Sequence, residues 1–177
     1  MATRSMALEL DVQYATGSAA GLPARRSIES WVRAALAGRT RGAQLAVRIV
    51  AEDEGRALNE RYRRRAGPTN VLSFPFEHPG RMRPPLLGDI VLCAPVVQRE
   101  AAAQGKAPRA HWAHLVVHGV LHLLGHDHED AREAARMEGL ETQILATLGY
   151  PDPYASEHPP APARRRASSH TGAGREQ

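Results

Sequence analysis

The stretch HWAHLVVHGVLHLLGHDH, residues 111–128, decides both the fold and the chemistry of this chain. It contains six of the nine histidines, set in an apolar background that predicts a helix over 108–124. Pro108 is placed to open that helix, because proline is favoured at the first helical position. Gly125 is the residue best able to take a left-handed conformation, so we expect it to end the helix and turn the chain back.

Three histidines of this stretch have the spacing of metal ligands. His118 and His122 are four residues apart, so on a helix they share one face with Cβ atoms roughly 5 to 6 Å apart. The turn at Gly125 can bring His128 back to them, which gives the pattern H-x-x-x-H-x-x-G-x-x-H. Three neutral imidazoles suit one zinc ion per chain and leave a fourth position open, as in catalytic sites. We therefore predict a zinc site at His118, His122 and His128.

The spacing matches the metzincin zinc pattern except at Gly119, where zincins carry a glutamate. That glutamate takes a proton from the metal-bound water, so without it the usual machinery of peptide hydrolysis lacks its base. A zinc metalloprotease-like hydrolase is therefore the weaker hypothesis. Two explanations of Gly119 stay open: a missing side chain lets a phosphate-sugar backbone approach the metal, or it permits tight helix packing.

Four neighbouring residues compete for roles around the predicted ion. His126 could replace the third ligand, although the turn after Gly125 needs some chain to reverse. His114, one helical turn before His118, and His111 are expected to line the approach, orient a ligand or pack. Asp127 either holds a ligand imidazole or contacts substrate, or it serves as a turn or N-cap residue.

Outward from this stretch, hydrophobic patterns predict strands and helices in mixed order. The alternation from Leu8 to Tyr14 is typical of a half-buried strand, and Pro75 places its own strand at a sheet edge or at a bulge. We predict an α+β single domain, with a small mixed sheet, an edge strand over the site and about five helices. The predicted strands are 8–14, 45–50, 70–77 and 86–93, and the predicted helices are 24–37, 52–64, 95–104, 108–124 and 129–148.

Length and composition agree with one globular domain. The 177 residues suit a catalytic domain over 1–154 followed by a disordered Pro/Ala/Arg-rich tail over 155–177. A net charge of +4 is too modest to indicate nucleic-acid binding alone. The lone Cys93 fits a reducing cytoplasm, and no apolar run approaches the roughly 20 residues of a membrane span.

Four motifs stand in order along the chain: ALNERYR (57–63), PTNVLSFPFE (68–77), LGDIVLC (87–93) and HGVLHLLGHDH (118–128). Together they resemble the YbeY family of bacterial metal-dependent endoribonucleases. The resemblance runs from about Leu8 to Tyr154, and His126 departs from it because relatives often have tyrosine there. It implies zinc held by His118, His122 and His128. It also implies cleavage of single-stranded RNA, maturation of the 16S rRNA 3′ end on the small ribosomal subunit, and ribosome quality control.

Arg63 falls at the functional arginine of that family, so the resemblance assigns it a catalytic role. A guanidinium can grip two phosphate oxygens and offset the charge that develops as a phosphodiester is cleaved. The alternative is a basic helix end, which cations stabilise. Asn59 and Asn70 could add neutral hydrogen bonds to the substrate, although turn and capping roles are equally open.

The combined hypothesis is a zinc-dependent endoribonuclease. Zinc can polarise a phosphoryl oxygen or lower the pKa of a bound water to roughly 7, and the RNA 2′-hydroxyl is a possible internal nucleophile. Imidazole also suits nickel, copper and iron, so the ion in the cell stays open. The remaining alternative is a non-enzymatic ribosome-assembly factor whose structural metal takes a fourth ligand from His114 or His126.

Overall fold

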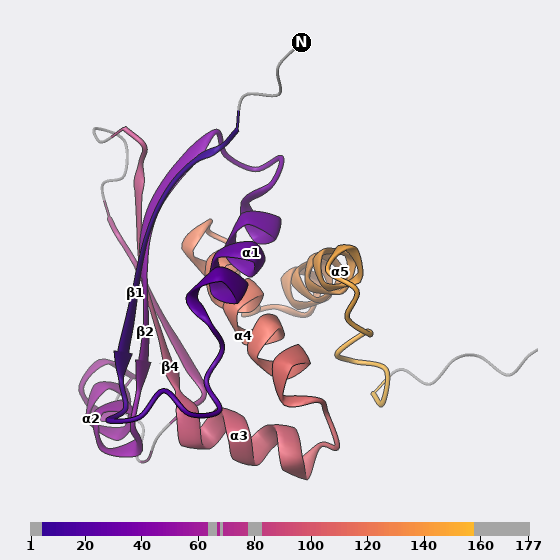
Figure 1. Ribbon diagram of the computed structural model, residues 1–177. Helices are drawn as coiled ribbons and strands as arrows, with labels where there is room; N and C mark the ends of the chain where they lie inside the picture. Colours follow the sequence, from indigo (N-terminus) through magenta and orange to yellow (C-terminus); the bar gives the residue numbers. More distant parts are fainter. Residues whose placement is uncertain (1–4, 64–66, 68, 78–82, 158–177) are drawn as a thin grey trace, which may run out of the picture.

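The structure, a computed structural model, describes residues 5–63, 67, 69–77 and 83–157, and within these ranges four strands form one mixed sheet. The strand order is β1-β2-β4-β3 (Figure 1). β3 lies at the sheet edge, as Pro75 predicts, because proline cannot donate to a further strand. β1 (Ala7–Ala15), β2 (Gly42–Val50) and β4 (Leu86–Cys93) run parallel, and β3 (Val71–Pro75) runs antiparallel to β4.

Helices cover the two faces of the sheet unequally. α1, α4 and α5 lie on one side of the sheet and α2 on the other, while α3 follows β4 directly and packs beside α4 (Figure 1). The fold is therefore the predicted α+β domain. The helices of the described chain are α1 (Arg25–Leu36), α2 (Glu52–Arg63), α3 (Ala94–Ala103), α4 (Pro108–Leu123) and α5 (Ala131–Thr147).

The period of two along the strands produces two cores. Ile90 and Leu92 of β4 belong to the main core with α1 and α4. Their neighbours Val91 and Cys93 point to the other face, where they pack with Leu58 of α2. The sheet thus separates α2 from the histidine-bearing α4.

The histidine-bearing α4 lies at the centre of the fold. It contacts α1, α3, α5, β3 and β4, which explains why it is apolar on nearly all sides. Pro108 stands in its first turn, as predicted. Gly125, with a φ of 95°, ends it by a Schellman arrangement, in which the amide of His126 donates to the Leu121 carbonyl at 3.0 Å. The predicted reversal of the chain after Gly125 is confirmed.

Three sequence-based boundaries move or fall outside the described chain. The strand predicted over 70–77 is shorter, because pairing with β4 spans only Val71–Pro75. The helix predicted over 129–148 begins later, since Asp130 is its N-cap and its carboxylate accepts from the Glu133 amide at 2.8 Å. Of the predicted tail, only residues 155–157 are described. In the described ranges, no helix is both long and apolar enough to cross a membrane.

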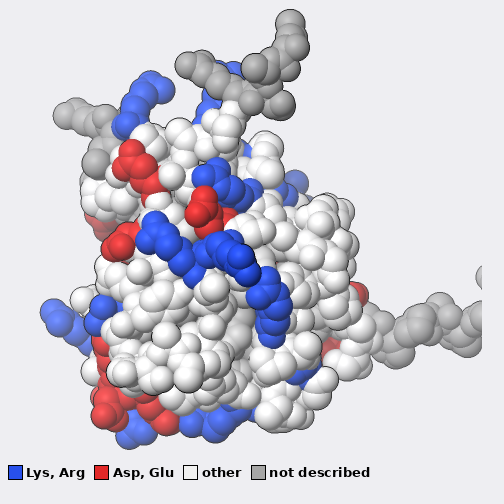
Figure 2. All heavy atoms as spheres, in the orientation of Figure 1, with Lys and Arg blue, Asp and Glu red and all other residues white. Residues whose placement is uncertain are grey.

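Charge is distributed unevenly over the surface. Figure 2 shows Lys and Arg side chains across the face formed by α1, whose sequence contains Arg25, Arg26 and Arg33. α2 begins with the acidic residues 52–54 and has Arg61 and Arg63 in its last turn. That order matches the helix dipole, so part of the basic run at the end of α2 has a structural explanation.

Candidate metal centre

Three histidines converge beside the C-terminal end of α4. His118 and His122 come from consecutive turns of the helix, and His128 comes from the loop that follows Gly125. One ring nitrogen from each lies within 4.8 Å of the other two. The ring centroids are 4.6 Å apart for His118 and His122, 5.0 Å for His122 and His128, and 5.8 Å for His118 and His128. The structure therefore brings together the three residues predicted as ligands.

The geometry of this group fits one small divalent ion. The Nε2 atoms of His118 and His122 are 3.0 Å apart. Two nitrogens bound to one tetrahedral zinc at about 2.0–2.1 Å lie roughly 3.3 Å apart, so little movement is needed. His128 is exposed, whereas the other two rings are half-buried. A bound ion would thus have solvent on the His128 side, where a fourth ligand could enter.

His122 is held neutral, as a metal ligand must be. Burial lowers the pKa of His122, and positive charge on His118 and His128 lowers it further, to about 4. The carboxylates of Asp127 and Glu141 act in the opposite direction but are outweighed. At neutral pH the His122 ring therefore keeps a free lone pair for a cation.

His126 and Asp127 lie in the turn beside the group. In the described chain, the histidine group that could hold an ion contains His128 and not His126. The Asp127 carboxylate accepts from the amide of His128 at 2.7 Å, which is the turn role that the sequence left open. Asp127 does not cap α5, because Asp130 does.

His114 and His111 are turned away from the three-histidine group and toward carboxylates. The Nε2 atom of His114 lies 2.6 Å from Glu141, and that of His111 lies 2.9 Å from Glu100. Asn70 donates from Nδ2 to the same Glu100 carboxylate, at 3.1 and 3.2 Å. His111 and Asn70 thus belong to a separate network between β3, α3 and α4.

Glu141 is the residue of the centre that the sequence-based prediction missed. Only 1% of it is exposed, and its Oε1 atom lies 2.6 Å from Nδ1 of His118. Burial alone raises the pKa of Glu141, but hydrogen bonds from His114 and His118 outweigh burial and lower the pKa to about 2. One signal was available: Glu141 follows Met137 by four residues, so it interrupts the apolar face of a predicted core helix.

Gly119 packs against the sheet rather than opening the centre. A Cβ atom at this position would lie 2.9 Å from Cγ2 and 3.1 Å from Cδ1 of Ile90 in β4. The idea that Gly119 leaves room for RNA beside the metal is therefore wrong, and tight packing is the explanation. A glutamate here, as in zincins, would have to displace Ile90, which weakens the metalloprotease hypothesis further.

Arg63 and Asn59 lie on α2, across the sheet from α4. Asn59 is buried, and its Nδ2 atom donates to the Gly67 carbonyl at 2.6 Å, a contact that supports the turn role rather than contact with substrate. Arg63 is exposed at the end of α2. Its neighbour Tyr62 packs edge-on against Phe74 of β3, with ring centroids 5.1 Å apart. The end of α2 is thus joined to the same edge strand that lies against α4.

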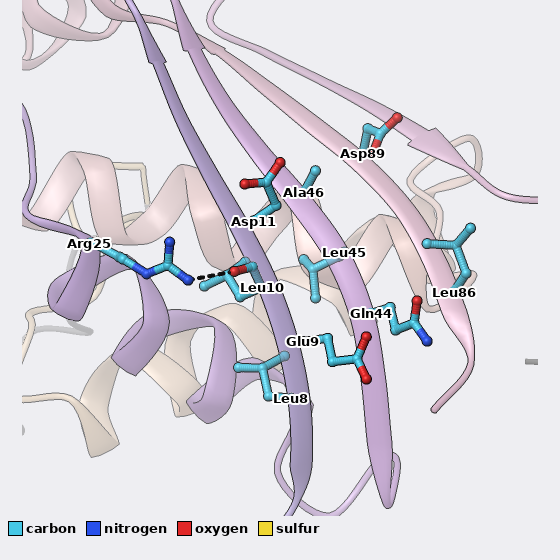
Figure 3. Close-up of a pocket in the computed structure, with 10 residues that line it drawn as sticks. All are labelled: Leu8, Glu9, Leu10, Asp11, Arg25, Gln44, Leu45, Ala46, Leu86 and Asp89. Atoms are coloured by element: carbon cyan, nitrogen blue, oxygen red, sulfur yellow. Dashed lines mark hydrogen bonds between the residues drawn. The ribbon is translucent and has the colours of Figure 1, made fainter. Parts of the chain in front are cut away.

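A hollow beside β1, β2 and β4 lies away from the histidines. It has a volume of about 540 Å³, and its lining includes the three carboxylates of Glu9, Asp11 and Asp89 (Figure 3). At its edge, the Arg25 guanidinium donates to the Leu10 carbonyl at 2.7 Å (Figure 3). Because no histidine lines this hollow, it is separate from the candidate metal centre.

Comparison with known proteins points in the same direction as the geometry. The family model described as Endoribonuclease YbeY matches residues 18–149. A protein named Endoribonuclease YbeY from Alkalilimnicola ehrlichii is 62% identical over 84% of this chain and 92% of that protein. One of the same name from Xanthomonas axonopodis pv. citri is 59% identical over 85% of this chain and 96% of its own length.

A likeness of fold extends to solved structures. The solution structure of TM1509 from Thermotoga maritima matches with a TM-score of 0.54 and 21% identity, over 79% of this chain and 91% of the other. At that identity the match supports the fold alone.

Proposed function

The chain belongs to the YbeY family of endoribonucleases, and on that premise we propose that it cleaves single-stranded RNA with the help of one zinc ion. The observation that carries the proposal is the convergence of three imidazoles on one point, with exposed His128 on the solvent side. We further propose that the substrate is precursor 16S rRNA on the small ribosomal subunit. Maturation of its 3′ end and ribosome quality control in the cytoplasm would be the cellular roles.

His118, His122 and His128 would hold the ion. When bound, it supplies Lewis-acid polarisation of a phosphoryl oxygen. The chain itself contributes a neutral His122 and a fixed arrangement of rings on one rigid helix. Because His114 is engaged by buried Glu141, it is not available as a fourth ligand, and this favours an open catalytic site over a structural metal.

Arg63 would contact the phosphate backbone of the RNA. It is exposed, and Tyr62 ties the end of α2 to Phe74 of β3. One residue earlier on β3, the Ser73 hydroxyl donates to the Gly119 carbonyl of α4 at 3.4 Å. This edge strand connects the arginine-bearing helix end to the metal helix, so a strand of RNA laid along the edge could reach both.

The attacking nucleophile separates two versions of this reaction. Attack by the RNA 2′-hydroxyl needs no general base in the position of the zincin glutamate and produces a cyclic phosphate. Attack by water produces a 5′-phosphate end downstream of the cut. End-group analysis of the cleaved RNA decides between them, and a 5′-phosphate product would exclude the internal nucleophile.

One experiment tests the proposed function against its rivals. Elemental analysis of the purified chain is combined with cleavage assays on single-stranded RNA, duplex RNA and casein. We expect about one equivalent of zinc per chain, cleavage of single-stranded RNA only, and loss of metal and cleavage in His122→Ala. Cleavage of casein would support the protease, and bound metal without any cleavage would support the assembly factor.

Arg63→Ala isolates the role of the arginine. Removing a group that offsets transition-state charge typically lowers the rate about 100-fold to 1000-fold, so we expect a loss of that size with metal content unchanged. Arg61→Ala is the matched control, because Arg61 is the neighbouring cation in the last turn of α2. Its guanidinium carbon lies 5.3 Å from the centroid of the Tyr62 ring. Equal losses in both variants would indicate general electrostatic attraction rather than a specific role of Arg63.

A further inference from the structure

We propose that Glu141, held by His114 and Tyr154, is the positioning residue that orients His118 toward the metal. The proposal rests on the metal centre of the proposed function. It assigns a role to three residues outside the three-histidine group, namely Glu141, His114 and Tyr154. It also makes the segment after α5 part of the centre.

The two ring nitrogens of His118 face different partners. Nδ1 lies 2.6 Å from Oε1 of Glu141, and Nε2 lies 3.0 Å from Nε2 of His122. An ionised carboxylate has acceptors but no donor, so the hydrogen of this bond belongs to His118 Nδ1. The lone pair of the neutral ring is then on Nε2, the atom that faces the other ligands.

Glu141 is itself fixed from its other side. Its Oε2 atom accepts from Nε2 of His114 at 2.6 Å and from the hydroxyl of Tyr154. Since Glu141 is almost wholly buried, these donors replace water and make the buried charge tolerable. A carboxylate with three donors has little freedom to rotate, so it holds the His118 ring in one orientation.

Tyr154 reaches Glu141 from the segment that follows α5. Asp152 shapes that segment, because its Oδ1 atom accepts from the amide of Tyr154 at 2.8 Å and from the hydroxyl of Thr142 in α5 at 3.3 Å. Pro153 between them is buried. The turn over residues 152–154 is thereby fastened to the helix that carries Glu141, and it completes the shell around the carboxylate.

A second metal ion is the rival explanation of this cluster. His114, His118 and Glu141 also have ligand atoms close together. However, a second ion here would use Nδ1 of His118 while the first uses Nε2, and it would have to displace the hydrogen bonds at 2.6 Å. Glu141 also offers no exposed side through which water could complete the coordination. A shell of hydrogen bonds around Glu141 explains these contacts without displacing any of them and without a path for water.

The test compares metal binding and ring tautomer in Glu141→Gln, Tyr154→Phe and the parent chain. Loss of an outer-shell partner typically lowers metal affinity roughly 10-fold to 100-fold, so we expect that loss in Glu141→Gln and a smaller one in Tyr154→Phe. Zinc affinity is measured by competition with a chelator. The tautomer is measured by ¹⁵N NMR of the His118 ring in the metal-free chain. The matched control is Glu133→Gln, which alters an exposed carboxylate in the first turn of the same helix.

The outcomes separate this inference from the proposed function. The inference is overturned if Glu141→Gln folds and keeps both the parental zinc affinity and the parental His118 tautomer. It is also overturned if the parent binds two zinc ions and the variant binds one. If Glu141→Gln does not fold, Tyr154→Phe carries the test, and parental affinity there overturns it. If the parent binds no zinc, the proposed function fails. The positioning role is still supported in that case if the His118 ring carries its hydrogen on Nδ1 in the parent and changes tautomer in the variant.

Discussion

Two histidine–carboxylate pairs on α4 differ in what the second ring nitrogen faces. His118 pairs with Glu141 at 2.6 Å, and its other nitrogen points to His122. His111 pairs with Glu100 at 2.9 Å, but its Nδ1 atom is buried and makes no hydrogen bond in the described chain. A carboxylate partner therefore does not by itself make a metal ligand. The second ring nitrogen must also face the ring nitrogens of other histidines, at a place that solvent can reach.

Both regions keep a histidine neutral, although their surroundings differ. Burial lowers the pKa of His111 and outweighs its contact with Glu100. Burial also lowers the pKa of His122, where neighbouring imidazoles add to the effect. A neutral ring thus occurs in both places, and only the one with converging neighbours can bind an ion.

Removing one histidine from each region tests this difference most directly. His122→Ala should lower zinc affinity by more than about 100-fold and abolish RNA cleavage, because a direct ligand matters more than its outer-shell support. His111→Ala should leave zinc affinity within roughly threefold, since its ring lies outside the centre. Chelator competition on the two folded variants measures both values. Similar losses of affinity would mean that the two regions form one coupled site.

Acid should destabilise the metal-free chain through the neutral histidines. The pKa of His122 is about 4 in the folded state and ordinary, near 6.5, in the unfolded state, so the unfolded state binds more protons between these values. The contribution of His122 to the free energy of unfolding is therefore fully present above pH 6.5 and is lost as the pH falls toward 4. Burial is the main cause of this lowered pKa and positive charge on His118 and His128 adds to it, while Asp127 and Glu141 oppose it.

The expected loss between pH 7 and pH 4.5 is about 2 kcal/mol, after allowance for solvent screening of the half-buried ring. Urea unfolding at the two pH values measures it. His122→Gln should flatten the dependence more than His111→Gln, because the pKa of His122 is lowered strongly, to about 4, whereas contact with Glu100 partly offsets the effect of burial on His111. An equal slope in the parent and His122→Gln would assign the effect to other groups.

The smallest predicted effect concerns Gly119, which follows His118 on α4. Gly119→Ala should lower the free energy of unfolding by about 1 kcal/mol, because overpacking against Ile90 exceeds the gain in helix propensity. Gly139→Ala is the matched control in α5, where a new Cβ meets nothing within 4 Å. That variant should be more stable by roughly 0.5–1 kcal/mol, since alanine is the better helix former. Urea midpoints test both, and equal stabilisation would contradict the packing role of Gly119.

Local patterns predicted the parts of the fold that depend on neighbours in sequence. The alternation in β1, the edge position of Pro75 and the turn at Gly125 all follow from backbone geometry within a few residues. The sequence left two roles of Gly119 open, because Ile90 meets it only after the sheet and α4 have packed. Asp130 rather than Asp127 caps α5, since the helix begins later than the hydrophobic pattern alone suggested.

That His118, His122 and His128 could meet was predictable from the residues, because helical spacing and one glycine turn act over short distances. Which carboxylate pairs with His118, and which ring nitrogen faces the other histidines, depends on tertiary packing. Glu141 lies on another helix, and it reaches His118 only because α5 packs against α4 and the turn at Tyr154 closes over it. Contacts between elements distant in sequence depend on packing, which no local pattern encodes.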